Sequence, residues 1–527
     1  MRQTLSLLFF VSLFISSQAQ EASYIYYWDN AKTQKRSEGI YFGGMEHRTW
    51  KYWYETGQLR EESNFFKGKY NGSSKVYHSN GKLNIEAYWY MGKQDSIMRV
   101  FSRDSVLLEE GMYRLGKKTG TWSYFNFDGS PGAVESHASG IMRLQQSWDE
   151  KGLQFIKDGK GELKEIYPSG GLKSQSLYEN GLLHGTYESY SPSGEIKEKG
   201  TFDKGLKSGL WENFFREGKV SERMSYAQDS LNGPYEKYQT ADMLEVRGGF
   251  SKGTKDGPWV WWDEKGLKDI EGAFNLGKQD GHWTYYHSNG KINYEGDYSL
   301  GRRTGTWSYF YLDGSSWRTG NYEEGIEEGE WITWFENGKE LQKGSYMKGL
   351  ENGLWTSWYE NGQKRDEGSF LNGKLDSLWK GWYENGGQSY QGSWIAEAKD
   401  GNWIFWAENG KKEEEGYYKN GVKHGPWKTY GKGGILISEG IFQNAHPQGK
   451  WNYYFPHGGI MRSCAYLEGK LYGQVVDYYT NGQIETECGY KNNRRDGTCR
   501  IYTERGKILE ETKYKDGSPI KTDSKKH

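Results

Sequence analysis

The most regular feature of this sequence is an alternation of aromatic, glycine and polar positions that recurs every 24 residues. In one copy, "GLWTSWYENGQKRDEGSFLNGK" from Gly353 to Lys374, apolar and polar residues alternate in two short segments around Asn361-Gly362. Such alternation is typical of half-buried β-strands, and Asn-Gly between two strands is a strong signal for a tight hairpin turn. The sequence therefore predicts one β-hairpin per copy, closed by a two-residue type I′ turn at Asn361-Gly362.

The copies extend through almost the whole chain. With the Trp of "GLW" as position zero, anchor residues keep a spacing of 24 from Leu163 to Cys499, which gives fifteen units without an insertion. Upstream, looser spacing adds six anchors, for about 21 units. These are Tyr26, Trp50, Ser74, Ile97, Trp122 and Gln145. Because units of this length stack on their neighbours, we expect an all-β fold, an elongated single-layer antiparallel meander of tandem 24-residue hairpins.

The hairpin register places large rings opposite glycines. If positions 6 and 7 form the turn, position zero faces position 13, and the aromatic position 15 faces position −2, which is Gly in fourteen of the fifteen regular units. An aromatic ring can cover the bare backbone of a cross-strand glycine and bury its own surface. We therefore expect these rings and glycines to be structural. The eight regular pairs are Trp259 with Gly272, Trp283 with Gly296, Trp307 with Gly320, Trp331 with Gly344, Trp355 with Gly368, Trp379 with Gly392, Trp403 with Gly416 and Trp427 with Gly440.

Position 3 is aromatic in fourteen of the fifteen regular units and falls on the opposite face of the sheet. Successive position-3 rings recur every two strands, about 10 Å apart. They either shield that face or form a ladder that contacts a partner. The candidate partner-binding residues are Trp262, Trp334, Trp358, Trp382 and Trp406.

Composition fits an aromatic sheet better than a set of conventional cores. Hydrophobic residues make up 35% and charged residues 26% of the 527 residues, yet 17% are aromatic and 73 are Gly, which argues against simple disorder. The net charge is −1 and both signs are interspersed. Nothing indicates a general affinity for nucleic acid or anionic lipid.

The first nineteen residues differ from the rest. Arg2 precedes an apolar run from Leu5 to Ile15, and Ser17 and Ala19 stand at small-residue cleavage positions. This pattern predicts a secretory signal peptide, and the run is too short to span a bilayer. We expect an exported protein, periplasmic or extracellular, without a transmembrane segment. The predicted division is a signal peptide (1–19), irregular repeats (20–162), a regular array (163–517) and a polar tail (518–527).

Catalytic and metal-binding motifs are absent from the sequence. The ten His lack metal-ligand spacing, and the glycines recur at the repeat period rather than in phosphate-binding loops. We expect neither an enzyme nor a metal or cofactor site.

The three cysteines occupy two repeat positions. Cys464 and Cys488 hold position 13 of adjacent units, about 10 Å apart, which is too far for a disulfide. Cys488 and Cys499 flank one inter-unit turn. They either pair, as an exported chain permits, or remain free thiols.

The pattern W-x-x-W-Y-E-N-G-x-x-x-x-E-G-x-F-x-x-G-K-x-x-G, clearest between Leu163 and Gly517, resembles the MORN-variant repeat (MORN-2 type) of bacterial proteins, some of which are classed as antitoxins. The resemblance implies tandem hairpins in one antiparallel sheet and a function by interaction rather than catalysis. Choline-binding modules also repeat Trp, Tyr and Gly, and hold their ligand between aromatics of successive hairpins. The "E-G-x-F" segment and the 24-residue period fit the MORN variant better.

We therefore expect an exported, non-catalytic scaffold for protein–protein interaction at the bacterial cell envelope. One alternative is binding of a cell-wall glycan or choline-type ligand through the aromatic ladder. The other is an antitoxin-like partner that neutralises a toxin, although a signal peptide does not fit a cytosolic antitoxin.

Overall fold

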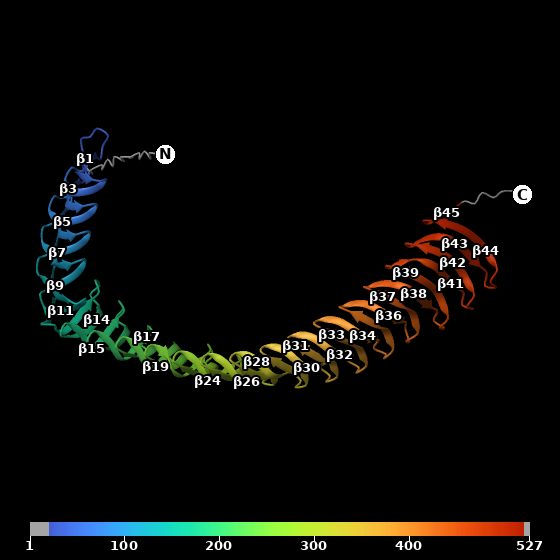
Figure 1. Ribbon diagram of the computed structural model, residues 1–527. Coiled ribbons are helices and arrows are strands. Elements are labelled where there is room, and N and C mark those ends of the chain that lie inside the picture. The colour runs from blue at the N-terminus through green and yellow to red at the C-terminus, as the bar shows by residue number, and fades with distance from the viewer. Residues whose placement is uncertain (1–19, 521–527) are drawn as a thin grey trace, which may run out of the picture. The chain divides into compact units, whose positions relative to one another are not determined.

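The computed structural model describes residues 20–520, and the predicted signal peptide lies outside these residues. The described part contains 45 strands and no helix. Each strand pairs antiparallel with its neighbours along the chain in an open sheet. The all-β, single-layer meander of tandem hairpins is confirmed (Figure 1).

Within the described residues, the strands divide between two compact units, residues 20–244 with 249–254, and residues 245–248 with 255–520. Two strands, β20 (Met243–Ser251) and β21 (Thr254–Lys255), contribute residues to both. The first unit contains β1 (Glu21–Tyr27), β2 (Lys35–Phe42), β3 (Met45–Trp53), β4 (Leu59–Phe66), β5 (Lys69–Tyr77), β6 (Leu83–Tyr90), β7 (Lys93–Phe101), β8 (Leu107–Arg114), β9 (Lys117–Phe125), β10 (Pro131–Ala138), β11 (Ile141–Trp148), β12 (Gln154–Lys157), β13 (Lys160–Ile166), β14 (Leu172–Glu179), β15 (Leu182–Tyr190), β16 (Ile196–Asp203), β17 (Leu206–Phe214), β18 (Val220–Ala227) and β19 (Ser230–Thr240).

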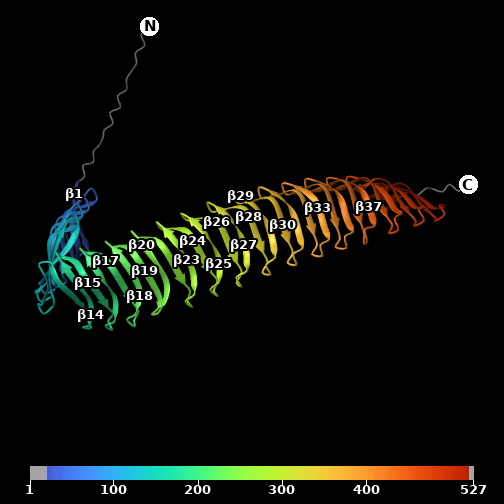
Figure 2. The same cartoon turned by 90° about the horizontal axis from the view of Figure 1, so that it is seen from below.

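The second unit is an elongated sheet in which strands lie side by side in chain order (Figure 2). It contains β22 (Gly257–Trp262), β23 (Lys268–Asn275), β24 (Lys278–Tyr286), β25 (Ile292–Ser299), β26 (Arg302–Phe310), β27 (Ser316–Glu323), β28 (Ile326–Trp334), β29 (Glu340–Met347), β30 (Leu350–Trp358), β31 (Lys364–Leu371), β32 (Lys374–Trp382), β33 (Gln388–Ile395), β34 (Ala398–Trp406), β35 (Lys412–Lys419), β36 (Val422–Tyr430), β37 (Leu436–Gln443), β38 (His446–Tyr454), β39 (Ile460–Leu467), β40 (Lys470–Leu471), β41 (Gly473–Tyr478), β42 (Ile484–Lys491), β43 (Arg494–Tyr502), β44 (Ile508–Lys515) and β45 (Ser518–Pro519).

The turn inside each repeat differs from the predicted one. Between β30 and β31, the Tyr359 N–H donates to the carbonyl of Gln363 and the Gly362 N–H donates to the carbonyl of Tyr359, both at 2.8 Å. Gly362 has φ 90°, whereas Asn361 is not among the residues with positive φ. The loop is therefore a type I turn closed by a left-handed glycine, and the predicted type I′ turn at Asn361-Gly362 is wrong.

The type I′ turn lies at the other end of the repeat, between units. Leu371 pairs with Lys374, and the two residues between them, Asn372 and Gly373, have φ 50° and 77°. Positive φ at both central residues defines this turn type. Asn-Gly occurs at both ends of the repeat and suits both turns, so the dipeptide alone does not distinguish them.

The predicted strand register holds along most of the hairpin. Trp355 pairs with Gly368 and Gly353 with Phe370, but an irregularity after Ser357 brings Trp358 opposite Lys364. A β-bulge of this kind takes up the extra residue of the longer loop.

The ring that covers each glycine comes from the next unit. A Cβ added to Gly368 would lie 2.1 Å from Cδ2 of Trp379, whereas the residue paired with Gly368 across the hairpin is Trp355. The Trp379 indole N–H also donates to the carbonyl of Ser369 at 3.0 Å. The anchor Trp therefore ties its own unit to the preceding one. The same close approach joins Gly39 to Trp50, Gly111 to Trp122, Gly200 to Trp211, Gly248 to Trp259, Gly272 to Trp283, Gly296 to Trp307, Gly320 to Trp331, Gly344 to Trp355, Gly392 to Trp403, Gly416 to Trp427 and Gly440 to Trp451.

The glycine at position −2 has a different role from the one expected. A Cβ on Gly353 would meet nothing within 4 Å, so Phe370 does not lie over it, but its φ of +75° favours glycine. Phe370 instead packs edge-on between Trp355 and Trp379, with ring centroids at 6.0 and 5.2 Å. Edge-to-face contacts of this type connect successive anchor rings.

The N-terminal repeats are more regular than the sequence indicated. Met98 pairs with Ala87 and Gly111, and Trp122 covers Gly111. The anchor position is thus held by Met98 rather than Ile97, and the period of 24 continues to Trp122. Cys488 and Cys499 face each other on β42 and β43 and form a disulfide, while Cys464 is free and buried.

Candidate binding surfaces

The two faces of the sheet carry different side chains. On β30, strand alternation puts Trp355 on one face, and Leu354, Thr356 and Trp358 on the other. We call the first the anchor face and the second the ladder face. The five predicted ladder tryptophans all lie on the ladder face and are half-buried.

Polar contacts bind neighbouring units on the ladder face. Lys412 pairs with Glu415 at 2.6 Å, and the hydroxyl of Tyr430, at position 3 of the next unit, donates to the same carboxylate at 2.5 Å. Glu271 receives the same two contacts from Lys268 and Tyr286. Burial opposes the charge on Glu271, but these hydrogen bonds outweigh it and lower its pKa. Tyr286 and Tyr430, both at position 3, therefore each have an internal partner.

Four of the tryptophans at position 3 have no such hydrogen bond. In the described part of the chain, no side-chain hydrogen bond involves the indole N–H groups of Trp334, Trp358, Trp382 and Trp406, which occupy four successive units. Trp262 stands apart, because Tyr286 and Phe310 hold position 3 in the units between. On the same face, beyond Thr356 and Lys380, Leu354 and Leu378 are 61% and 46% exposed. We call these four tryptophans the indole row.

On the anchor face, basic side chains lie over the anchor rings. Lys423 Nζ lies 3.9 Å from the centroid of Trp427 and pairs with Glu414 at 3.0 Å. The sequence analysis did not predict these cation–π contacts, although a basic residue recurs four positions before the anchor Trp and could have indicated them. These basic residues are Lys118, Lys207, Lys255, Arg303, Lys399 and Lys423.

Some of these cations are held mainly by rings. Lys399 Nζ lies 4.4 Å from the Trp403 centroid and 4.8 Å from that of Phe405. Desolvation by these rings lowers the pKa of Lys399, and it lowers the pKa of Lys255 in the same way. The rings attract the ammonium group, but they also exclude water, and the lost hydration outweighs the attraction.

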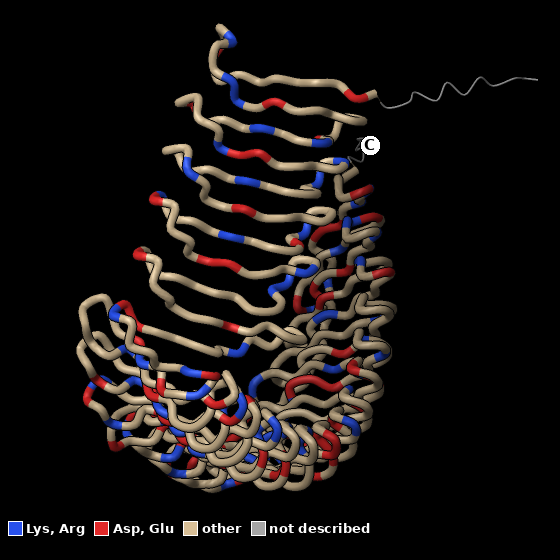
Figure 3. Tube along the Cα trace, turned by 90° about the vertical axis from the view of Figure 1, so that its left-hand side faces the viewer, with Lys and Arg blue, Asp and Glu red and all other residues tan. Residues whose placement is uncertain are grey.

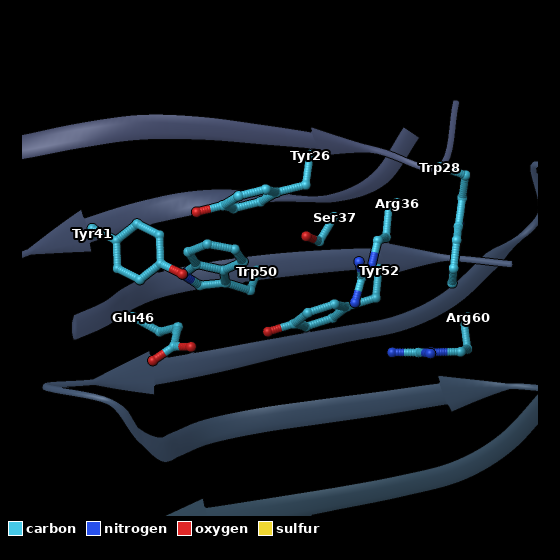
Figure 4. Close-up of a pocket in the computed structure, with 9 residues that line it drawn as sticks. All are labelled: Tyr26, Trp28, Arg36, Ser37, Tyr41, Glu46, Trp50, Tyr52 and Arg60. Atoms are coloured by element: carbon cyan, nitrogen blue, oxygen red, sulfur yellow. The ribbon is translucent and has the colours of Figure 1, made fainter. Parts of the chain in front are cut away.

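A cavity of about 330 Å³ opens on the anchor face of the first repeats (Figure 4). Burial raises the pKa of Tyr41 and of Tyr52 to about 12, and the nearby carboxylate of Glu46 adds to both shifts. No sequence signal singled out this cavity. Its lining residues are Tyr26, Trp28, Arg36, Ser37, Tyr41, Glu46, Trp50, Tyr52 and Arg60.

Charges of both signs are interspersed along the strands (Figure 3). Within residues 20–520, no group of three or more His, Cys, Asp or Glu side chains could hold a metal ion. No helix long and apolar enough to cross a membrane occurs in that range.

These features define a tandem β-hairpin repeat protein. The family model described as "MORN repeat variant" matches residues 49–67, 70–89, 160–180, 183–204, 279–299, 327–348, 351–372, 399–420, 471–492 and 495–516. The chain belongs to the MORN-variant repeat proteins. No curated protein sequence matches it.

Solved structures of Tc toxin complexes show distant similarity. A TcdB2–TccC3–Cdc42 complex is 10% identical, covers 91% of this chain and has a TM-score of 0.14. A Photorhabdus luminescens Tc holotoxin pore is 10% identical, covers 86% of this chain and has a TM-score of 0.13. The chain spans about 30% of the length of each. Superposition at this level does not bear on function.

Proposed function

We propose that the protein is an exported, non-catalytic scaffold that binds a protein partner at the bacterial cell envelope through its ladder face. The observation that carries the proposal is the indole row, four tryptophans in successive units whose N–H groups have no hydrogen-bond partner within the described residues.

The chemistry of the indole row suits a protein surface. Tryptophan is enriched among the residues that dominate protein–protein binding, where a ring fills a pocket and its N–H finds an acceptor. The exposed Leu354 and Leu378 add apolar surface on the same face, and the polar row that contains Glu367 of the Lys364–Glu367 ion pair lies between them and the tryptophans. Protein–protein interfaces combine apolar contacts with polar side chains in this way.

Two features support export. The first nineteen residues carry the pattern of a signal peptide. The Cys488–Cys499 disulfide fits an oxidising compartment better than the cytosol. Both features disfavour a cytosolic antitoxin role. Cell fractionation tests this part of the proposal: full-length, uncleaved protein accumulating in the cytosol would contradict it.

A pull-down from the cell envelope tests the interaction. The mature chain, residues 20–527, is compared with the double variant Trp358→Ala/Trp382→Ala and with the control Phe310→Ala/Tyr478→Ala, which alters the same repeat position outside the indole row. We expect one envelope protein to be retained by the wild type and the control, and to be at least about tenfold depleted with the first variant. Equal retention by all three would rule out the indole row.

The absence of catalysis is part of the proposal, because the repeat pattern accounts for the described chain and the sequence lacks recognisable catalytic motifs. Turnover assays on envelope hydrolase substrates test it. Reproducible activity lost by a single substitution would contradict it.

A further inference from the structure

Over seven of the twelve anchor tryptophans in the described part of the chain, a cation of the chain itself lies against the ring. Over Trp122, Lys118 Nζ lies 3.8 Å from the ring centroid and is bonded to Glu109 at 2.9 Å and to the Tyr124 hydroxyl at 2.8 Å. Burial opposes this charge, but the hydrogen bonds raise the pKa of Lys118. Tyr113 closes the site edge-on at 5.0 Å from Trp122.

A cation also lies over Trp331, although the acidic and the basic residue occupy each other's repeat positions there. Over Trp331, the residue four positions before the anchor is Glu327, and the cation comes instead from Arg318, thirteen positions before it. The Arg318 guanidinium carbon lies 4.1 Å from the ring centroid, and Arg318 pairs with Glu327 at 3.1 Å.

The site over Trp50 keeps the rings but has lost the cation. Tyr41 and Tyr52 stand where Tyr113 and Tyr124 stand around Trp122, and Tyr41 lies 4.8 Å from Trp50 in the same edge-on geometry. Glu46 replaces the lysine, four positions before the anchor, and Ser37 replaces the acid. Neither position supplies a cation, and the cavity of about 330 Å³ occupies this region.

The charged residues that line this cavity have no ionic partner. Within residues 20–520, Glu46, Arg36 and Arg60 form no ion pair with one another or with any other side chain. Figure 4 shows Glu46 beside Tyr41 at one end and the two arginines near Trp28 at the other, with the rings between. Arg36 and Arg60 stack on Trp28 and Tyr52 at 5.0 and 5.6 Å, which leaves their N–H groups available to an anion.

We propose that this cavity binds a small zwitterion, with an alkylammonium group against Glu46 among the rings of Tyr41, Trp50 and Tyr52, and an acidic group at Arg36 and Arg60. The ammonium takes the place that Lys118 Nζ takes over Trp122. Cation–π attraction and a carboxylate counter-ion recognise it, and paired guanidinium groups suit a carboxylate. The site lies on the anchor face of the first repeats, so it is independent of the partner surface proposed above.

Binding of 6-aminohexanoate to the mature chain, followed by calorimetry, tests the proposal. We expect saturable binding that is at least about tenfold tighter than that of pentylamine or hexanoate, which each carry one of the two charges. Glu46→Lys restores the internal cation and should abolish binding. Glu46→Gln, which adds no bulk, should weaken it about tenfold, and Arg36→Gln/Arg60→Gln should reduce it to the level of pentylamine.

The matched control is Glu351→Lys, the same exchange four residues before Trp355. There, Ser357 replaces the second ring, so binding at the Glu46 site should be unchanged. Hydrogen exchange at β2 to β4 confirms that each variant is folded. No saturable binding by the wild type, or equal binding by folded Glu46→Lys and Glu46→Gln variants, would overturn the proposal.

Discussion

At the residue scale, the stability of the sheet depends on a contact between an anchor Trp and the glycine eleven residues before it. The Trp379 ring lies where a side chain on Gly368 would stand, and Trp379 is only 8% exposed. Because this contact joins two units, its loss should loosen both.

Gly368→Ala should therefore destabilise the region around β31 and β32 by about 2 to 4 kcal/mol, since the added methyl group displaces the Trp379 ring and exposes apolar surface. Hydrogen exchange of the backbone amides measures the effect. The control is Gly171→Ala, whose Cβ would meet only the Pro192 carbonyl oxygen at 3.7 Å. Equal exchange in the two variants would show that ring cover does not stabilise the sheet.

A second residue-scale prediction concerns pH. His282 is partly buried, which disfavours its charge, but hydrogen bonds to Asp297 and Glu295 outweigh burial and raise its pKa above the ordinary value of 6.5. A raised folded-state pKa means that the stabilisation is complete below the unfolded pKa and is lost as pH rises through the folded value. The side chain is 56% exposed, so screening limits the effect to about 0.2–1 kcal/mol.

NMR titration of the His282 ring should give a pKa above 6.5, and the protection of amides near β24, measured relative to the intrinsic exchange rate at each pH, should fall between pH 6 and pH 8. His282→Gln should remove that pH dependence. A ring pKa below 6.5 would contradict the prediction.

Aligning the repeats by position correctly placed Trp355 opposite Gly368, because strand pairing within a hairpin follows from counting residues away from the turn. This alignment did not identify Trp379 as the ring that covers Gly368, because the cover depends on how far an indole reaches across to the next strand. The cavity at Glu46 was also missed, because a vacant site becomes visible only when the filled sites around Trp122 and Trp331 are known.

At the element scale, each repeat has two different turns, and the one between units needs positive φ at two consecutive residues. Most repeats place Gly at the second residue, but the turn between β33 and β34 uses Ala396 and Glu397, with φ 47° and 72°. An L-residue in this region costs roughly 1 kcal/mol. This turn is therefore less stable than the one at Asn372-Gly373.

Replacing both residues, Ala396→Asn/Glu397→Gly, should stabilise the β33–β34 hairpin by about 1 kcal/mol. The reverse exchange, Asn372→Ala/Gly373→Glu, should destabilise β31–β32 by a similar amount. Hydrogen exchange of the two hairpins measures both effects in otherwise identical chains. A destabilising effect of the Asn-Gly exchange at 396–397 would contradict the assignment of a type I′ turn.

The sequence predicted the hairpins correctly but gave the wrong type for the turn inside the repeat, and one physical reason explains both outcomes. Alternation fixes which residues face each other, whereas Asn-Gly satisfies both a type I′ turn and a type I turn that ends in a left-handed glycine. The number of residues between the last paired positions decides which of the two turn types forms. That number depends on the β-bulge before Trp358.

At the scale of the whole molecule, stability is spread over many similar contacts between neighbouring units. Repeat proteins of this kind have a stability close to a sum of unit terms and nearest-neighbour terms. A whole repeat should therefore be removable. Deletion of residues 349–372 joins Lys348 to Gly373 and leaves an intact two-residue turn, because Lys348 and Gly373 both have positive φ already.

The deletion variant should keep the far-ultraviolet circular dichroism per residue of the wild type. The control deletes residues 363–374, which removes the single strand β31 and leaves Trp379 without Gly368 beneath it. That variant should lose ordered structure around β30 and β32. Equal spectra and equal proteolytic resistance for the two deletions would contradict a fold in which each anchor needs the glycine of the preceding strand.

The central claim is that the anchor face holds the sheet together while the indole row on the ladder face is available to a partner. Hydrogen exchange of Trp355→Ala and Trp358→Ala, measured beside binding of the protein recovered by pull-down, tests it most directly. Trp355→Ala should raise exchange in β29 to β31, with a local cost of about 2 to 4 kcal/mol. Trp358→Ala should leave exchange nearly unchanged and weaken binding. If Trp358→Ala instead loosens its unit as much as Trp355→Ala does, while partner binding is unaffected, the position-3 rings are structural and the claim is wrong.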